Sequence, residues 1–260
     1  MGIDIFIRNP KGITLTKDGV EFLSYARQVV EQTNLLEERY KSHTETRELF
    51  SVSSQHYAFV VNAFVSLLKR ADMTRYELFL RETRTYEIIE DVKNFRSEIG
   101  VLFLNGYNRD VLTKMFDDNR LTYTSLFKAR PHIFVSKSNP LAKHEVVSLE
   151  DLEDFPYLSY DQGIHNSFYY SEEILSQIPH KKSIVVSDRA TLFNLLIGLD
   201  GYTIATGILN SNLNGDNIVS IPLDIDDEID IVYLKHEKAT LSKMGEKFLD
   251  NLVKEVTFDN

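Results

Sequence analysis

The chain has 260 residues, of which 43% are hydrophobic, and its 39 acidic and 29 basic residues give a formal net charge of −10. This length is enough to bury one or two cores, whereas the negative charge makes the whole chain a poor binder of nucleic acid phosphates. The chain has no cysteine, which excludes disulfides, thiolate metal ligands and a cysteine nucleophile. No apolar run approaches the roughly 20 residues of a membrane span, and the start lacks a signal-peptide pattern. We therefore expect a cytoplasmic protein with no membrane contact.

The first predicted elements are a β-hairpin and a long helix. Residues 3–15 contain two β-rich runs separated by an Asn-Pro-Lys-Gly turn at residues 9–12. Thr16 is placed to cap a helix that continues to about residue 43. Because an isolated hairpin is marginally stable in water, we expect it to pack against another part of the protein.

The predicted helix carries an apolar seam. The seam residues repeat with alternating steps of four and three, as in a heptad, and are Phe22, Ala26, Val29, Thr33, Leu36 and Tyr40. A seam of this kind usually pairs with a second helix, so we predict a homodimer formed through it. The alternative is a long helix that packs on its own domain.

From residue 48 onward the sequence alternates between strand and helix patterns. The predicted strands cover residues 49–53, 76–80, 99–104, 121–129, 132–135, 156–160, 183–186, 202–205, 218–221 and 229–234. The predicted helices cover residues 57–70, 86–95, 167–177, 190–199 and 241–256, and a capping box at residues 148–151 opens a short one. Two successive βαβαβ runs predict an α/β fold with two lobes and a cleft. Since ligands of such sheets bind beyond the carboxyl ends of the strands, the loops there are the candidate site.

The candidate loops contain polar turns rather than enzyme motifs. The sequence has no dinucleotide-binding, phosphate-loop, serine-hydrolase or zinc-protease motif, and its seven histidines show no metal-ligand spacing. The turn at residues 53–56 (Ser-Ser-Gln-His) joins a strand to a helix, where backbone N–H groups can bind an anion. Ligand binding is favoured over two alternatives, a helix cap at Ser54 and a catalytic serine paired with His56. We expect no catalytic residue, metal or cofactor.

Similar polar turns flank other predicted elements, and each has the alternative of being a plain helix cap. They are Thr83-Arg84-Thr85, Ser187-Asp188 and Thr206-Gly207. Four basic residues are candidates for neutralising a carboxylate, with solvated surface as the alternative: Arg84, Lys128, Arg130 and Arg189.

Several segments resemble the LysR-type transcriptional regulators. Residues 6–19 resemble the end of that family's winged helix-turn-helix domain, where a Leu-Phe-x-Arg run precedes Leu-Thr-x-x-Gly, here LTKDG. Residues 25–27 (Tyr-Ala-Arg) are similar to the linker helix that follows. Residues 131–152 resemble a family segment with Pro-Leu-Ala before a short helix, and residues 198–207 resemble its GxGIxxLP segment. The order and spacing of these segments match the family over the whole chain.

The resemblance implies an α/β fold with a two-lobed effector domain of the periplasmic-binding-protein type. Lobe I would comprise residues 47–127 and 227–260, and lobe II residues 128–226. A hairpin wing at residues 1–16 and a linker and dimerisation helix at residues 17–46 would precede the effector domain.

The resemblance also implies a DNA-binding transcriptional regulator that senses a small-molecule effector between its lobes and acts as a homodimer or a homotetramer. The family's effector sites map onto Ser53, Ser54, Gln55, Thr85, Phe103, Leu104, Arg130, Tyr160 and Thr206. The other implied partner is promoter DNA. Arg8 and Lys11 at the hairpin tip would contact its phosphates, which position a protein on DNA without reading the base sequence.

The front of the chain departs from the family pattern. The family's recognition helix, which supplies base contacts in the major groove, has no counterpart in this sequence. We therefore predict an N-terminally truncated regulator that binds promoter DNA specifically only in a full-length form. The alternative is a solute-binding receptor of the same fold without a DNA role, which the missing signal peptide and the heptad seam argue against. An α/β enzyme is disfavoured because no catalytic constellation is present.

Overall fold

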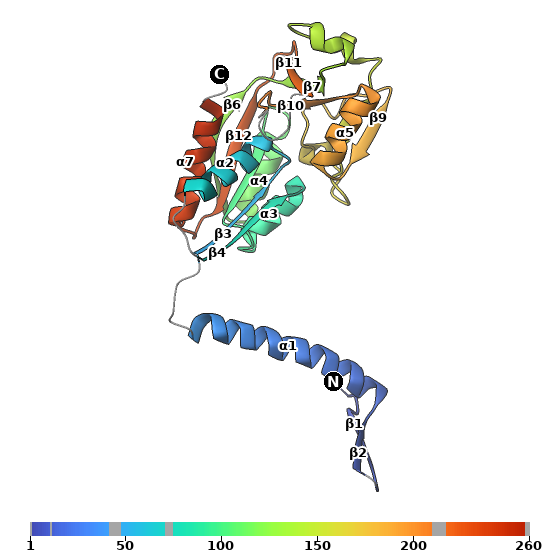
Figure 1. Cartoon of the computed structure of the whole chain (residues 1–260), viewed down its shortest axis with the longest axis vertical. Helices are drawn as coiled ribbons and strands as arrows, with labels where there is room; N and C mark the ends of the chain where they lie inside the picture. Colours follow the sequence, from blue (N-terminus) through green and yellow to red (C-terminus); the bar gives the residue numbers. More distant parts are fainter. Residues whose placement is uncertain (1, 11, 42–47, 71–74, 210–216, 258–260) are drawn as a thin grey trace. The chain divides into compact units, whose positions relative to one another are not determined.

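The computed structural model of the chain describes residues 2–10, 12–41, 48–70, 75–209 and 217–257. The chain separates into two units, Met1–Arg47 and Glu48–Asn260, which contain the elements labelled in Figure 1. Among the described residues, no helix is both long and apolar enough to span a bilayer.

The N-terminal unit begins with the predicted hairpin. Strand β1 (Phe6–Asn9) pairs with strand β2 (Gly12–Leu15) in antiparallel register, so that Phe6 lies opposite Leu15. The hairpin is therefore confirmed. Lys11, at its tip, lies outside the described residues.

Helix α1 (Lys17–Lys41) begins where Thr16 caps it. The Thr16 hydroxyl accepts a hydrogen bond of 2.7 Å from the Gly19 amide, which confirms the predicted cap. Gly19 also lies where the helix meets the hairpin, since a Cβ atom there would be 2.1 Å from the Ile5 carbonyl oxygen. Only glycine permits this approach, and the segment leading into the hairpin therefore packs on the first turn of the helix. The predicted helix end near residue 43 lies outside the described residues.

The predicted seam of α1 leaves apolar side chains uncovered within the N-terminal unit. Val29 is 66% exposed and Leu36 is 57% exposed. Three other seam residues are half-buried or exposed: Phe22, Ala26 and Thr33. The Tyr40 side chain lies outside the described part of the helix. An apolar stripe of this kind is a surface that a partner can cover.

The first sheet of the C-terminal unit has five strands. They are β3 (Glu48–Ser54), β4 (Tyr76–Glu82), β5 (Ile99–Leu104), β6 (Leu121–Ala129) and β12 (Ile229–His236). Their order across the sheet is β4-β3-β5-β12-β6. Strand β3 is parallel to β4 and β5, whereas β12 is antiparallel to β5 and β6. The predicted parallel βαβαβ unit is confirmed, and the last strand of the chain enters the sheet between β5 and β6.

Helices cover both faces of this sheet. One face carries α2 (Ala58–Arg70) and α7 (Lys243–Thr257), and the other carries α3 (Thr85–Lys93) and α4 (Arg109–Asp118). The side chains of β5 alternate accordingly, because successive strand residues point to opposite faces. Val101 belongs to the core under α2 and α7, whereas Leu102 belongs to the core under α3 and α4.

Helix α4 is absent from the prediction made from the sequence. Its residues, RDVLTKMFDD, are mostly charged or polar, and only Leu112 and Phe116 among them are buried. The apolar residues Val111, Leu112, Met115 and Phe116 span less than two turns, which is too short a run to establish a helical period.

The second sheet also has five strands. They are β7 (His132–Ser136), β8 (Tyr157–Tyr160), β9 (Ser183–Val186), β10 (Tyr202–Ala205) and β11 (Ile218–Pro222). Their order is β11-β7-β10-β8-β9, with β8 parallel to β9 and β10, and β7 antiparallel to β10 and β11. Helix α5 (Arg189–Leu199) packs on one face through Leu192 and Leu196. On the other face lie two 3₁₀ helices, η1 (Pro140–Lys143) and η2 (Glu150–Leu152).

The predicted capping box precedes η2. The Ser148 amide donates a hydrogen bond of 2.7 Å to the Asp151 carboxylate, and the Asp151 amide donates one of 3.4 Å to the Ser148 hydroxyl. The two side chains thus satisfy each other's backbone N–H groups, as the pattern predicts.

The prediction of a helix over residues 167–177 is wrong. Only the single 3₁₀ turn η3 (Phe168–Tyr170) forms there. The next residues turn the carboxylates of Glu172 and Glu173 inward, where they accept hydrogen bonds from His56 and Tyr160. These contacts with distant parts of the chain replace the helical hydrogen bonds that the local pattern favours.

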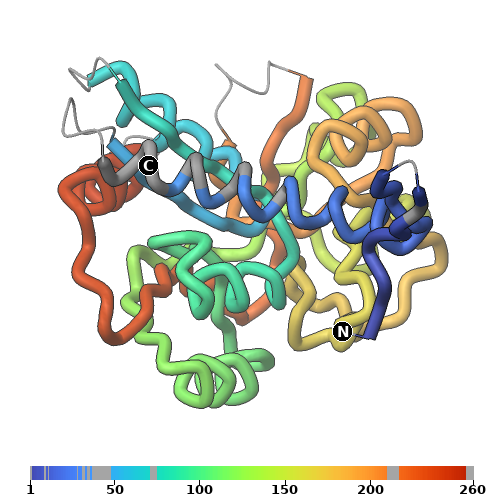
Figure 2. Tube along the Cα trace, turned by 90° about the horizontal axis from the view of Figure 1, so that it is seen from below, coloured from blue at the N-terminus to red at the C-terminus, as the bar shows by residue number. Residues whose placement is uncertain are grey.

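Two short connections join the sheets. The chain passes from β6 to β7 through residues 130–131 and returns from β11 to β12 through residues 223–228. The connections touch, because the Leu223 amide donates a hydrogen bond of 3.0 Å to the Pro131 carbonyl. Figure 2 shows the resulting lobes side by side, one drawn mainly in cyan, green and red and the other in yellow and orange. This is the two-lobed α/β fold that the sequence predicts.

Candidate functional site

A cavity lies where the two sheets meet. It encloses about 630 Å³, including the space at its open mouth. The first lobe contributes the segment after β3 (His56, Tyr57, Ala58, Phe59), Phe103 of β5 and Ile229 of β12. The second lobe contributes Phe134 of β7, Tyr160 of β8, the segment Glu172, Glu173 and Ile174, and Arg189, Leu192 and Phe193 of α5. It also contributes β10 and the turn after it (Thr203, Ile204, Ala205, Thr206, Ile208). Several of these segments follow the carboxyl ends of parallel strands, where α/β sheets place their ligands.

The wall of the cavity is largely apolar and aromatic. Six aromatic side chains contribute to it: Tyr57, Phe59, Phe103, Phe134, Tyr160 and Phe193. Tyr57 stacks on Phe59 with ring centroids 4.8 Å apart, and Tyr160 stacks on His56 at 4.0 Å. Apolar walls with a few convergent polar groups are typical of sites that bind small molecules.

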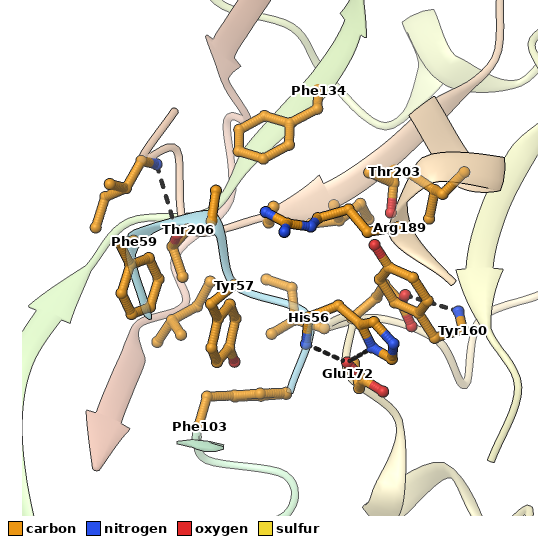
Figure 3. Close-up of a pocket in the computed structure, with 18 of the residues that line it drawn as sticks. His56, Tyr57, Phe59, Phe103, Phe134, Tyr160, Glu172, Arg189, Thr203 and Thr206 are labelled. Atoms are coloured by element: carbon orange, nitrogen blue, oxygen red, sulfur yellow. Dashed lines mark hydrogen bonds and ion pairs between the residues drawn. The ribbon is translucent and has the colours of Figure 1, made fainter. Parts of the chain in front are cut away.

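His56 and Glu172 form a buried pair across the cavity (Figure 3). The His56 amide and Nδ1 lie 2.9 and 2.8 Å from Glu172 Oε2, and Gln162 Nε2 donates to the other carboxylate oxygen at 3.1 Å. Burial disfavours the protonated imidazole, but the hydrogen bond and charge of Glu172, with a smaller contribution from Glu82, outweigh it and raise the pKa of His56. Since His56 follows a strand of the first sheet and Glu172 belongs to the second lobe, the pair joins the lobes.

Two further ion pairs cross between the lobes. Arg189, the first residue of α5, lies 3.2 Å from Glu82 at the end of β4, and Arg84 pairs with Asp161. Burial raises the pKa of the Glu82 carboxyl, although Arg189 opposes that effect. The Arg189 side chain extends into the space that the other labelled residues line (Figure 3). Its Nη1 atom is buried and has no hydrogen-bond partner among the described residues.

Glu173 is the most deeply buried acid of the cavity lining. It is 3% exposed, and its Oε1 accepts a hydrogen bond of 2.9 Å from the Tyr160 amide. Its Oε2 atom has no hydrogen-bond partner within the described part of the chain. Burial and the neighbouring charge of Glu172 raise the pKa of the Glu173 carboxyl well above its usual value. An incompletely partnered acid in a cavity is a candidate contact for a ligand.

Three of the residues predicted as effector-binding lie in the cavity lining: Phe103, Tyr160 and Thr206. Gln55 and Thr85 lie directly behind it and are fully buried. The Gln55 carbonyl accepts hydrogen bonds from the Tyr57 hydroxyl at 2.7 Å and the Phe103 amide at 3.0 Å, and its amide donates to Thr85 Oγ1 at 2.6 Å. Gln55 therefore holds two lining residues in place rather than facing the cavity itself.

The other predicted residues lie away from the lining. The Ser53 hydroxyl is 2.7 Å from Asp91 and 2.8 Å from Ser97, below the first sheet. Leu104 packs in the core under α3 and α4, and Arg130 is exposed on the connection between the sheets. The Ser54 hydroxyl is buried with no partner among the described residues, so it does not cap α2, which begins at Ala58.

Glu172 and Glu173 are charged lining residues that the sequence analysis misses. An adjacent acidic pair inside an expected amphipathic helix is typical of a solvated face. Nothing in the local pattern indicates that both side chains turn inward. The inward position of Glu172 depends on contacts with His56, which lies 116 positions earlier in the chain. That of Glu173 depends on the Tyr160 amide. A single sequence carries no signal for either pairing.

The cavity presents groups that can bind a small molecule. Within the described residues, no group of three histidine, aspartate or glutamate side chains is arranged to hold a metal ion. The lining combines aromatic and aliphatic side chains with two threonines, one arginine, one histidine and two carboxylates. They can enclose a small organic molecule and orient it by charge.

Comparison with known proteins gives a consistent result. The model of the LysR substrate binding domain matches residues 53–257. No curated protein sequence matches the chain.

Among solved structures, the chain is similar to a full-length OxyR variant from Pseudomonas aeruginosa, with 16% identity and a TM-score of 0.56 over 96% of this chain and 85% of that one. It is also similar to a hydrogen-peroxide-bound OxyR mutant from Corynebacterium glutamicum, with 14% identity and a TM-score of 0.57 over 99% of this chain and 80% of that one. A third similar structure is HinK, a LysR family transcriptional regulator from Pseudomonas aeruginosa, with 15% identity and a TM-score of 0.54 over 93% and 81% of the two chains. At these identities the structural likeness concerns the fold.

Proposed function

The chain belongs to the LysR family through its substrate-binding domain, and on that premise we propose that it is the sensing part of a transcriptional regulator. A small-molecule effector binds in the cavity between the two sheets. The observation that carries this proposal is the composition of the cavity wall, to which both lobes contribute residues. A ligand held by both lobes favours one relative arrangement of them, which is how occupancy can shift a conformational equilibrium.

The polar contacts around the cavity support such a coupling. Three ion pairs connect the lobes: His56 with Glu172, Arg189 with Glu82, and Arg84 with Asp161. A ligand that enters the cavity lies beside the first two of them. Its contacts therefore add to or compete with the contacts that hold the lobes together, and binding changes the relative stability of the lobe arrangements.

The N-terminal unit supports a DNA role rather than that of a solute receptor. Arg8 is exposed in the hairpin and can contact the phosphates of promoter DNA. Phosphate contacts position a protein on DNA without reading its sequence. We propose that the ligand-dependent arrangement of the lobes changes how the regulator holds its promoter.

The sensing proposal is tested by a thermal-shift screen of small organic molecules against the 260-residue chain. A true effector should stabilise the protein by an amount that rises with the logarithm of its concentration and reaches about 2.7 kcal/mol at 100 times Kd. The variant Thr206→Phe, which places a ring in the cavity lining, should lose this stabilisation because it fills the binding space. The matched control Thr240→Phe, at an exposed position, should keep it. An unchanged ligand shift in a folded Thr206→Phe variant would place the site elsewhere.

We also propose that α1 forms a homodimer. The supporting observation is the exposure of Val29 and Leu36 on the heptad seam. Replacing both by glutamate should raise the dimer dissociation constant by at least about tenfold, which corresponds to 1.4 kcal/mol, as measured by sedimentation equilibrium. The control is Ser24→Glu, an exposed position on the opposite side of the helix, which should leave association unchanged. Equal dimerisation of all three proteins would contradict an interface on the seam.

A further inference from the structure

Two backbone positions where an anionic ligand could bind are already occupied by the protein's own side chains. The amide of His56, in the turn before α2, donates to the Glu172 carboxylate at 2.9 Å. The amide of Thr85, at the start of α3, donates to Gln162 Oε1 at 3.2 Å. Backbone N–H groups at helix starts are the usual anion sites of α/β folds. An anionic ligand would have to displace Glu172 to reach the first of them.

The side-chain charges of the cavity are also unfavourable to an anion. Arg189 is balanced by Glu82 at 3.2 Å, and His56 is balanced by Glu172 at 2.8 Å. Apart from tyrosines, the one other ionisable group in the lining is Glu173, and no basic residue pairs with it among the described residues. The cavity therefore has no surplus positive charge for a carboxylate, but it has a surplus acid for a cation.

Within the described residues, Glu173 also has a free hydrogen-bond acceptor in the cavity lining. It is 3% exposed and lines the cavity, and its Oε2 atom has no hydrogen-bond partner among the described residues. Leaving a buried polar atom unpaired is unfavourable. A ligand group that donates a hydrogen bond and carries a positive charge would remove that penalty and would favour the ionised carboxylate.

The aromatic wall suits the same chemistry. Tyr57, Phe59 and Phe103 belong to the first lobe. Phe134, Tyr160 and Phe193 belong to the second lobe. Aromatic faces attract cations through their quadrupole, more strongly when the cation is removed from water. A cage of aromatic rings with a buried acid at its edge is a combination that recognises an ammonium group and an apolar body together.

We infer that the effector is a small organic amine, bound as a cation with its ammonium group at Glu173 and its apolar body among the aromatic side chains. The unpartnered Nη1 of Arg189 then donates to a neutral acceptor on the ligand, such as a hydroxyl or carbonyl oxygen. This inference rests on the proposed sensing function, because it names the chemical class that the same cavity takes.

The test compares probes of matched size and opposite charge by isothermal titration calorimetry. The probes are 2-phenylethylamine and 3-phenylpropionate, with butylamine and butyrate as a smaller aliphatic pair, titrated into the 260-residue chain. In each pair the amine should bind at least tenfold more tightly than the carboxylate. The variant Glu173→Gln should weaken amine binding at least tenfold. The control Glu153→Gln, an exposed acid paired with Lys181, should leave it unchanged.

The outcomes separate this inference from the sensing proposal. Tighter binding of the carboxylates would overturn the inference and leave the proposed sensing function standing. Amine binding that Glu173→Gln does not weaken, in a variant with native circular dichroism, would overturn the assignment of the ammonium to Glu173. If neither series binds, the cavity does not take small organic cations, and the thermal-shift screen decides independently whether it binds any effector.

Discussion

Replacing Glu172 by alanine is expected to lower the free energy of unfolding by about 3–5 kcal/mol, the usual loss when one member of a buried ion pair is removed. The Glu172 side chain is 3% exposed and that of His56 is 7% exposed. In the variant, the His56 amide and imidazole and the Gln162 amide all lose their acceptor. Water cannot reach these buried groups freely, so their desolvation is no longer compensated. Urea unfolding of the wild type and the variant at pH 6 measures the difference.

The pH dependence of the same pair provides a second measurement. The pKa of His56 is raised in the folded protein, because Glu172 and Glu82 together outweigh the opposing effect of burial. The stability that His56 contributes is therefore fully present below the unfolded pKa of about 6.5 and is lost as the pH rises through the raised value. The wild type should accordingly lose its advantage over His56→Asn between pH 6 and alkaline pH.

The control for Glu172→Ala is Glu153→Ala. Glu153 forms an exposed ion pair with Lys181, of which the side chains are 56% and 63% exposed. Exposed pairs contribute about 0–1 kcal/mol, so this variant should be close to the wild type at every pH. A loss of less than about 1 kcal/mol in Glu172→Ala would show that the interlobe pair does not stabilise the fold.

Local sequence patterns predict most of the fold. Short runs of apolar, aromatic and β-branched residues predict the ten strands of the two sheets, and turns with a capping residue predict helix starts such as the one at Thr16. The failures occur where local pattern and tertiary contact disagree. Helix α4 is stabilised by two buried residues and is too short for its sequence to show a clear helical period. In residues 171–177, Glu172 accepts a hydrogen bond from the other lobe.

The candidate site is predicted only as far as topology determines it. The rule that ligands lie beyond the carboxyl ends of parallel strands selects the loops at that edge. The resemblance to LysR-type regulators adds Phe103, Tyr160 and Thr206, which the structure places in one cavity wall. The polar turn and the resemblance also select Ser53, whose hydroxyl instead contacts Asp91 and Ser97. The inward turn of Glu172 and Glu173 arises from contacts between lobes, which no spacing in the sequence reveals.

Replacing Glu173 by glutamine is expected to have the opposite effect from the Glu172 change and to raise the free energy of unfolding at neutral pH, by about 1.4 kcal/mol for each unit by which the folded pKa of Glu173 exceeds its unfolded pKa. Burial and the charge of Glu172 raise the pKa of Glu173 well above its usual value. The folded state therefore disfavours the ionised carboxylate, whereas the unfolded state allows it at neutral pH, and this difference lowers the stability of the fold. Glutamine has the same shape, keeps an oxygen for the Tyr160 amide and carries no charge.

The sign of the pH dependence follows from the raised pKa. A carboxyl whose folded pKa is raised contributes most to stability below its unfolded pKa, and that contribution is lost as the pH rises through the folded value. The gain in Glu173→Gln should therefore be absent below about pH 4 and grow toward neutral pH. The groups around the carboxyl are Glu172, Tyr57, Tyr157 and Tyr160; burial raises the pKa of each of these tyrosines well above its usual value, so they remain neutral throughout.

Unfolding curves of the wild type, Glu173→Gln and Glu153→Gln from pH 4 to 8 test this expectation, with the exposed Glu153 variant expected to show no trend. A Glu173→Gln protein that is less stable than the wild type at pH 7 would show that the carboxylate is satisfied in the fold and not available to a ligand. If the variant is more stable and also binds amines more weakly, the chain retains at this position an acid that lowers its own stability. An unfavourable group of this kind is understandable at a ligand contact, because functional sites commonly sacrifice stability for binding. Opposite stability effects at two adjacent glutamates would then distinguish the acid that holds the lobes together from the acid that meets the ligand.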